Sequence, residues 1–196
     1  MSEHSDPPVK VPVKLVVAGG FGVGKTTFVR SISDIEPLTT EEAMTVVGDA
    51  VDDRGEVRSK TTTTVAMDFG RVDIDEQIVL YLFGTPGQER FGFMWNDLAR
   101  GALGAVVLVD TRRLADSFVA IDFFESREVP FVVAVNEFDG MVRHGLDEVR
   151  AALAVGSDTP VVVTDARRRD DVKRTVLQLL DVVLQRALTR AAAAPT

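Results

Sequence analysis

The sequence predicts an α/β fold with three layers, in which helices cover both faces of a mostly parallel six-stranded sheet. Short valine-rich apolar segments alternate along the chain with longer segments whose apolar residues recur at helical spacing. Three of the short segments are continuous apolar runs, which is typical of strands buried on both faces of a parallel sheet. The length of 196 residues suits one compact domain.

Six segments are predicted to be strands because β-branched and aromatic residues dominate them over a strand's length. They are residues 14–18, 64–73, 77–83, 105–110, 131–136 and 161–164. A short polar turn at Asp75 and Glu76 separates the second from the third, which indicates a hairpin. We therefore expect one antiparallel strand at the edge of the sheet.

Four segments are predicted to be helices because their apolar residues form a stripe. They are residues 25–33, 114–128, 146–155 and 171–188. The last stripe is the clearest, and we interpret it as a core-packing face. Its members are Val172, Val176, Leu179, Leu180, Val183, Leu184 and Leu188.

These elements define one domain over residues 12–190, between a flexible N-terminal tail (1–11) and a C-terminal tail (191–196). Residues 35–60 are polar and acidic, and we expect them to form a long mobile loop.

Composition excludes several classes of function. The chain has no cysteine, so disulfides and thiolate metal sites are excluded. A net charge of −8 opposes general binding to nucleic acid or to anionic membranes. The N-terminus lacks the apolar core of a signal peptide, and no residue suits a lipid anchor. We therefore expect a cytoplasmic protein that reaches a membrane only through a partner.

A glycine-rich segment lies between the first predicted strand and the first predicted helix. It reads Gly19-Gly20-Phe21-Gly22-Val23-Gly24-Lys25-Thr26 and fits the phosphate-loop pattern G-x-x-x-x-G-K-[ST]. Main-chain amides of such a loop surround phosphates at the N-terminus of a helix. We expect Lys25 to contact the β- and γ-phosphates, Thr26 to bind Mg²⁺, and Thr27 to join the nucleotide site. The predicted fold is therefore that of a P-loop nucleoside triphosphatase.

A second motif follows the predicted strand 131–136. Asn136-Glu137-Phe138-Asp139 resembles Asn-Lys-x-Asp, the base-recognition motif of the Ras-like small GTPases. The resemblance implies a Ras-like G domain that binds GTP and GDP, with Asp139 accepting hydrogen bonds from guanine and Asn136 joining this loop to the phosphate loop. Glu137 replaces the family's lysine, whose stem lies along the base, and Phe138 is a candidate for the missing apolar surface. The alternative role for Asp139 is a helix cap.

A third motif, Asp165-Ala166-Arg167, follows the last predicted strand at the place of the family's Ser-Ala-Lys-like element. The resemblance implies that the Ala166 N–H faces the guanine O6 and that Arg167 lies beside the base. The alternative is that the arginines at 167–169 belong to a solvated loop.

The segment from Gly84 to Arg90 resembles the family's switch motif Asp-x-x-Gly-Gln-Glu. The resemblance implies that Gly87 donates its N–H to the γ-phosphate and that Gln88 orients the attacking water, beside Lys25. Gly84 stands where the family has the aspartate that holds Mg²⁺ through a water. We therefore expect a weakened metal site, or one that relies on other groups.

Threonines at 61–64 resemble the switch I segment, and Thr64 is the expected Mg²⁺ ligand, with Thr63 as the alternative. A threonine run is also ordinary at the start of a strand. Three arginines are candidates for an intrinsic arginine finger, and each is alternatively a surface residue. They are Arg54, Arg58 and Arg90.

Within the small GTPases, the combination of Gly84 with the segments 64–70, 135–140 and 165–167 is similar to the conservon-type GTPases of actinobacteria, relatives of the bacterial polarity GTPase MglA. The resemblance implies a slow GTPase that acts as a switch in bacterial signalling, as a monomer or weak dimer. It implies a roadblock-domain regulator, a sensor-kinase-like protein and, for some members, a pentapeptide-repeat protein as partners.

Two other functions stay open at this point. A pseudo-GTPase would bind nucleotide as a scaffold with little or no hydrolysis, which Gly84 and Glu137 motivate. A P-loop ATPase or small-molecule kinase would need an acceptor site and a lid, for which the sequence offers no candidate.

Overall fold

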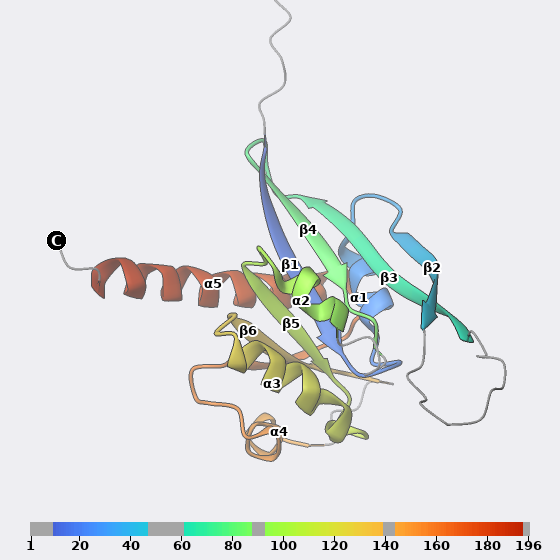
Figure 1. Cartoon of the computed structure of the whole chain (residues 1–196). Helices are drawn as coiled ribbons and strands as arrows, with labels where there is room; N and C mark the ends of the chain where they lie inside the picture. The colour runs from blue at the N-terminus through green and yellow to red at the C-terminus, as the bar shows by residue number, and fades with distance from the viewer. Residues whose placement is uncertain (1–9, 47–60, 88–92, 139–143, 194–196) are drawn as a thin grey trace, which may run out of the picture.

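The computed structural model describes residues 10–46, 61–87, 93–138 and 144–193 (Figure 1). The strands are β1 (Val11–Gly19), β2 (Leu38–Val46), β3 (Thr61–Asp73), β4 (Ile78–Gly84), β5 (Gly104–Val109), β6 (Phe131–Asn136) and β7 (Val161–Thr164). The helices are α1 (Lys25–Ile32), α2 (Phe93–Ala99), the 3-10 helix η2 (Leu114–Ser117), α3 (Phe118–Ser126), α4 (Leu146–Leu153) and α5 (Arg169–Ala193).

The described strands form one sheet in the order β2-β3-β4-β1-β5-β6-β7. All neighbouring pairs from β4 to β7 are parallel, whereas β3 is antiparallel to both β2 and β4. This confirms the predicted α/β fold with a mostly parallel sheet and one antiparallel strand. The described sheet has one strand more than the six expected, so β3 lies one position in from the edge.

The additional strand is β2, which falls within the segment expected to be a loop. Its nine residues pair with β3 from Leu38 opposite Phe69 to Val46 opposite Thr61. Polar residues fill most of its length. An edge strand is held by main-chain hydrogen bonds and needs no continuous apolar face, so its sequence carries little of the usual strand signal.

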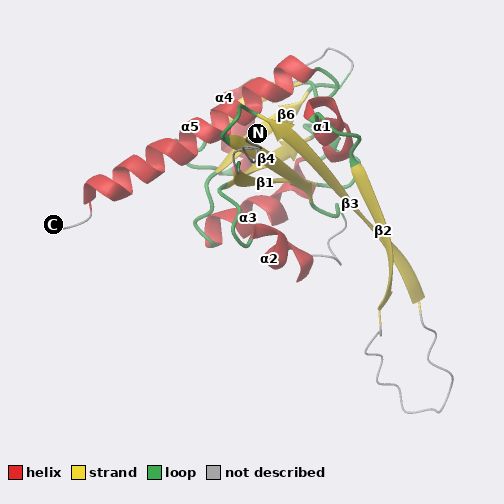
Figure 2. Cartoon of the chain, turned by 90° about the horizontal axis from the view of Figure 1, so that it is seen from above, coloured by secondary structure: helices red, strands yellow, loops and turns green. Residues whose placement is uncertain are grey.

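Successive side chains of the central strands point to opposite faces of the sheet, so the core is divided into two parts, one on each face. Leu15 and Val17 of β1 pack with α1 and α5, whereas Val16 and Ala18 pack with α2, α3 and α4. Figure 2 shows α1 and α5 on one side of the sheet and α2 and α3 on the other. The prediction of strands buried on both faces is confirmed.

Helix α5 extends beyond the sheet, as the red helix in Figure 1 shows. Leu179 is fully buried, but Leu184 and Leu188 are each more than half exposed. The prediction that the whole stripe packs in the core is therefore wrong for its last two members, because no sheet lies beneath them. Within the described residues, no helix combines the length and apolarity needed to cross a bilayer.

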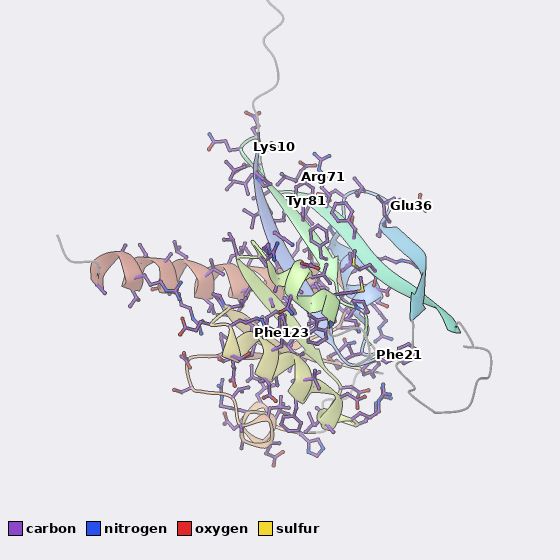
Figure 3. The ribbon with its side chains drawn as sticks, in the orientation of Figure 1. Lys10, Phe21, Glu36, Arg71, Tyr81 and Phe123 are labelled. Carbon is purple, nitrogen blue, oxygen red and sulfur yellow. The ribbon has the colours of Figure 1, made fainter. Side chains whose placement is uncertain are left out.

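Helix α2 has no counterpart among the predicted helices. It brings Trp95 into the core, where the indole meets Phe123 of α3 edge-on with ring centroids 5.3 Å apart. Phe123 is labelled in Figure 3, on the α3 side of the sheet. At seven residues, the helix is too short to show a helical period in sequence.

Candidate nucleotide-binding site

The phosphate loop lies at the carboxyl end of β1, in the middle of the sheet, and leads directly into α1. Gly19 and Gly24 have φ values of 136° and 106°, which residues that carry a side chain rarely adopt. A Cβ on Gly19 would lie 2.4 Å from the Leu108 carbonyl oxygen, and one on Gly24 would lie 2.6 Å from Asn136 Nδ2. Only glycine fits at these two positions, and the backbone turns closely enough to present its amides to an anion.

Lys25, the first residue of α1, folds back over this loop. Its Nζ donates hydrogen bonds to the carbonyl oxygens of Gly19 at 3.0 Å and Gly20 at 2.8 Å. The side chain is only 8% exposed. Burial lowers the pKa of Lys25 from 10.5 to about 8, although the charge of nearby Asp68 partly opposes the shift. Burial thus disfavours the charged form of Lys25, and the negative charge of a bound polyphosphate would stabilise that form.

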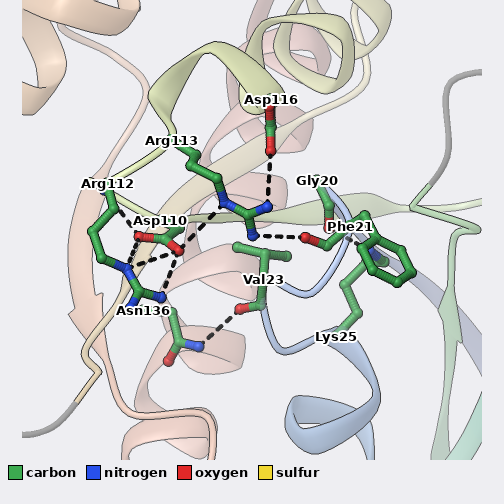
Figure 4. Close-up of polar contacts among 9 residues, drawn as sticks. All are labelled: Gly20, Phe21, Val23, Lys25, Asp110, Arg112, Arg113, Asp116 and Asn136. Atoms are coloured by element: carbon green, nitrogen blue, oxygen red, sulfur yellow. Dashed lines mark hydrogen bonds and ion pairs between the residues drawn. The ribbon is translucent and has the colours of Figure 1, made fainter.

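Asn136, at the end of β6, joins the phosphate loop to the loop after β7. Figure 4 shows its contact with Val23 of the phosphate loop. Its Nδ2 donates to the Val23 carbonyl oxygen at 2.8 Å, and its Oδ1 accepts from the Ala166 N–H at 3.0 Å. Both bonds are buried, so they resist exchange with water. The phosphate loop and the loops after β6 and β7 are thereby fixed relative to one another by one side chain.

The loops after β5 and β7 each contain an Asp-x-Arg element with the same internal geometry. Asp110 accepts hydrogen bonds from the main-chain N–H and the guanidinium of Arg112, at 2.8 to 3.2 Å. Asp165 accepts the equivalent bonds from Arg167, at 2.9 to 3.0 Å. The hydrogen bonds from each arginine side chain are the main cause that lowers the pKa of its aspartate. Two arginine side chains are thus oriented by carboxylates on either side of the β6 loop.

Arg112 and its neighbour Arg113 connect the β5 loop to the other loops of the site. The Arg112 guanidinium lies 4.3 Å from the centroid of the Phe138 ring. Arg113 Nη2 donates to the Phe21 carbonyl oxygen of the phosphate loop at 2.9 Å, while the same guanidinium is 3.7 Å from Asp116. Figure 4 shows both arginines converging on Asp110.

Neither arginine of the β5 loop was expected from the sequence. The available signal was the repeated spacing of Asp110-x-Arg112 and Asp165-x-Arg167 after two strands that flank β6. A cation of the β5 loop, Arg112, therefore lies beside the β6 loop, in which Glu137 stands at the position of the lysine expected from the resemblance.

Asp68 of β3 is a further site residue that sequence reasoning missed. Its Oδ2 accepts a 2.6 Å hydrogen bond from the Thr26 hydroxyl, and its side chain is buried. In the β3–β4 ladder it stands opposite Gly84. The signal lay in the hairpin register, which places residue 68 across from the position where the family's aspartate is absent.

Gly87 lies against the phosphate loop. A Cβ there would be 2.7 Å from Lys25 Nζ and 2.9 Å from the Phe21 Cα. Phe21 itself, labelled in Figure 3, leaves its ring 64% exposed at the surface of the loop. The switch segment thus begins in contact with the loop that is expected to hold the phosphates.

The structure brings together the phosphate loop, Asn136, Phe138, Ala166 and Gly87. Arg167 is paired with Asp165 by the bonds given above. Thr64 lies in β3, with its main chain opposite Ala43. Several expected residues fall outside the described residues, namely Arg54, Arg58, Gln88, Arg90 and Asp139.

With a phosphate loop at the end of β1 and further loops after β6 and β7 at the same edge of the sheet, the chain has the fold of a G-domain P-loop nucleoside triphosphatase. Residues 17–186 match the family described as "Conserved hypothetical ATP binding protein", and the chain belongs to that family. The chain is similar to the uncharacterized protein MJ1339 of Methanocaldococcus jannaschii, at 31% identity over 132 residues, which are 66% of this chain and 73% of that protein.

Ras-related proteins are also similar to nearly the whole chain. Human Rab-7b is 26% identical over 195 residues, covering 94% of this chain and 87% of Rab-7b. Rat Rab-27B is 28% identical over 196 residues, covering 89% of this chain and 80% of Rab-27B. The G-domain of FeoB from Methanococcus jannaschii has the same fold, with a TM-score of 0.58 over 89% of this chain and 99% of that domain, at 13% identity.

Proposed function

We propose that the chain is a small GTP-binding protein that hydrolyses GTP slowly to GDP and acts as a nucleotide-dependent switch. The observation that carries this proposal is the position of Asn136, whose amide bonds the phosphate loop on one side and the Ala166 loop on the other. This arrangement would hold a polyphosphate at the first loop and a purine at the second at a fixed separation. The similarity to Ras-related proteins over most of the chain supports guanine as the base.

The switch itself would act through contacts that only GTP can make. Gly87 lies beside Lys25, so a γ-phosphate at the loop would meet both the Gly87 N–H and the Lys25 ammonium. Loss of that phosphate would remove the contacts and change the surface of the following segment. Gln88 is proposed to orient the attacking water and Arg90 to stabilise the developing charge. Hydrolysis without a partner is proposed to be slow.

An adenine nucleotide is the second candidate ligand. The family to which the chain belongs is described by ATP binding, and Glu137 replaces the lysine of the guanine motif. Guanine would be preferred by roughly 1–3 kcal/mol, because adenine leaves the Asp139 carboxylate without its hydrogen-bond donors. A scaffold that binds guanine nucleotide without hydrolysis is the third candidate, and it shares the same binding site.

Titration of nucleotide-free protein with a fluorescent GDP analogue, followed by competition with GTP, GDP and ATP, tests the choice of base. We expect GTP and GDP to compete at micromolar concentrations and ATP about 5- to 150-fold more weakly, as roughly 1–3 kcal/mol implies. Asp139→Asn should shift the preference toward xanthosine nucleotides. If ATP competed as strongly as GTP and GDP, the site would not prefer guanine and an adenine nucleotide would be the better candidate ligand.

A single-turnover hydrolysis assay distinguishes a switch that hydrolyses GTP from a scaffold that binds GTP without hydrolysis. The wild-type chain should convert bound GTP to GDP, and Gln88→Leu should slow this conversion while leaving GDP affinity unchanged. A wild-type chain that binds GTP and never hydrolyses it would assign the scaffold function. Equal rates for wild type and Gln88→Leu would exclude the proposed role of Gln88.

The wider setting is proposed from the family resemblance alone. We propose a conservon-type or MglA-like role in bacterial signalling, in the cytoplasm, with any membrane contact made through a partner. Regulators of the roadblock, sensor-kinase-like and pentapeptide-repeat kinds would read the nucleotide state. Co-purification of a roadblock-domain protein that prefers the GTP-loaded over the GDP-loaded chain would test this.

A further inference from the structure

Asp68 fills the space that a side chain at position 84 would occupy. The two residues face each other in neighbouring antiparallel strands, β3 and β4. A Cβ built on Gly84 would lie 3.0 Å from the Asp68 Cβ and 3.2 Å from its Oδ2. A carboxylate therefore stands close to the expected place, although it comes from the opposite strand of the hairpin.

The same carboxylate contacts the residue expected to ligate Mg²⁺. Thr26 Oγ1 donates its only hydrogen to Asp68 Oδ2 at 2.6 Å, so the oxygen lone pairs of the hydroxyl stay available to a cation. The Asp68 side chain is 8% exposed, and its negative charge acts on Lys25 of the phosphate loop. A buried anionic group thus lies beside both functional side chains of the loop.

These groups fit the chemistry of magnesium. Mg²⁺ takes oxygen ligands, retains several waters, and is usually held by one or two carboxylates together with substrate phosphates. In the part of the chain that the structure describes, no group of three or more His, Cys, Asp or Glu side chains could hold a metal unaided. A site that needs the nucleotide phosphates, one hydroxyl and one carboxylate agrees with both facts.

We infer that Asp68 is the carboxylate of the divalent-cation site, taking the place that Gly84 leaves empty. It holds the Thr26 hydroxyl in the orientation that a cation requires and supplies the negative charge that balances the cation. A side chain at position 84 would crowd Asp68, so glycine there leaves room for this carboxylate. This inference rests on the proposed function, since the phosphates of a bound nucleotide complete the site.

The test measures how Mg²⁺ changes the release of a fluorescent GDP analogue from the full chain. Release rates are recorded in excess Mg²⁺ and in a chelator, for wild type, Asp68→Asn and Asp73→Asn. Asparagine can still accept the Thr26 hydrogen bond, so Asp68→Asn removes charge with little change of shape. Asp73 lies in the same strand and pairs with Lys10 and Arg71 at the surface, which makes Asp73→Asn the matched control.

We expect Mg²⁺ to slow release from wild type and from Asp73→Asn. In Asp68→Asn the Mg²⁺ concentration needed for this effect should rise by about 10- to 100-fold, the usual cost of losing an outer-shell metal partner, while release in chelator stays unchanged. An unaltered Mg²⁺ requirement would overturn the inference. If Asp68→Asn released the GDP analogue faster than wild type by the same factor in Mg²⁺ and in chelator, the inference would also be overturned, since that result would show a purely structural role for Asp68.

An exchange of the two residues adds an independent test. Gly84→Asp alone places two carboxylates together and should destabilise the chain. The double variant Asp68→Gly/Gly84→Asp should recover the slowing of release by Mg²⁺. A double variant that folds but whose release does not respond to Mg²⁺ would contradict the idea that the carboxylate can come from either strand. A wild-type chain that binds no nucleotide would refute the proposed function, whereas nucleotide binding that ignores Mg²⁺ would refute only the role of Asp68.

Discussion

Asn136 Nδ2 donates a buried 2.8 Å hydrogen bond to the carbonyl oxygen of Val23, which lies 113 residues earlier in the chain. The Asn136 side chain also accepts from Ala166, 30 residues later. Segments from the beginning, middle and end of the sequence are thus held by one amide group. The relative positions of the three loops of the candidate site therefore depend on this group.

Asn136→Ala should therefore weaken both the fold and the site. It leaves the Val23 carbonyl and the Ala166 N–H without their partner, which costs about 1–3 kcal/mol in the free energy of unfolding. We expect GDP affinity to fall in the same variant, because the loops lose their fixed separation. Urea unfolding and fluorescent GDP titration measure the two effects.

Asn96→Ala is the control for this variant. Asn96 accepts hydrogen bonds from Arg127 at the surface, away from the phosphate loop. This change should alter stability by less than about 0.5 kcal/mol and leave GDP affinity unchanged. If Asn136→Ala behaved like Asn96→Ala in both measurements, the bridging role of Asn136 would be wrong.

Arg112→Ala tests whether the stack of Arg112 on Phe138 supports the base loop. A cation over an aromatic ring contributes from about 0.5 to about 2 kcal/mol. We expect GDP affinity to fall by about 2- to 30-fold, while the affinity for tripolyphosphate, which has no base, stays unchanged. Competition of both ligands against the fluorescent GDP analogue measures the difference.

Arg174→Ala is the matched control for Arg112, since Arg174 also pairs with an aspartate, Asp171, but on α5. It should leave both affinities unchanged. Equal loss of GDP and tripolyphosphate affinity in Arg112→Ala would contradict a role at the base and indicate a general disturbance of the site.

Features determined by local sequence were predictable, and features that depend on register or on the sheet edge were not. The phosphate loop is a continuous string whose glycines and lysine each have a local reason, so its position at the end of β1 could be expected. The buried strands were predictable because their apolar runs are continuous. The leucines at 184 and 188 have the same pattern as buried ones, and only the extent of the sheet decides their exposure.

Asp68 and β2 show why the rest could not be predicted. Asp68 meets Thr26 across 42 residues, and this contact depends on the register that sets Asp68 opposite Gly84. A shift of one residue would send the carboxylate to the other face of the sheet. Strand β2 is held at the sheet edge by main-chain pairing, to which side-chain patterns respond only weakly.

Gly87→Ala should separate GTP from GDP binding. The added methyl group would lie 2.9 Å from the Phe21 Cα and 2.7 Å from Lys25 Nζ, so the switch segment has to move away from the phosphate loop. Only GTP presents a γ-phosphate to the Gly87 N–H. We expect the affinity for a non-hydrolysable GTP analogue to fall by about 10- to 100-fold, as expected for a lost charge-assisted hydrogen bond, and GDP affinity to change little.

Gly145→Ala is the control, because a Cβ there meets nothing closer than Glu148 Oε2 at 3.9 Å and its φ of −63° suits alanine. It should leave both affinities unchanged. Equal losses for the GTP analogue and GDP in Gly87→Ala would show that Gly87 does not distinguish the two nucleotides.

The pKa of Lys25 predicts that nucleotide binding depends on pH. Burial lowers this pKa to about 8 in the free chain, so the side chain is charged below that pH and increasingly neutral above it. Bound phosphates favour the charged form and raise the pKa again. Above about pH 8, binding must therefore take up a proton, and the contribution of Lys25 to the affinity should fall by up to about tenfold per pH unit, whereas below about pH 7 this contribution should be constant.

Calorimetric titration with GDP between about pH 7 and about pH 9, in two buffers of different ionisation enthalpy, measures the proton uptake directly. Lys25→Arg keeps a positive charge throughout this range, so its affinity should lack the part of the pH dependence that belongs to Lys25. Titration of the ligand itself affects both chains equally and cancels in the comparison. Identical pH profiles for the two chains, or no proton uptake by the wild type above about pH 8, would show that Lys25 does not contact the phosphates in the manner proposed.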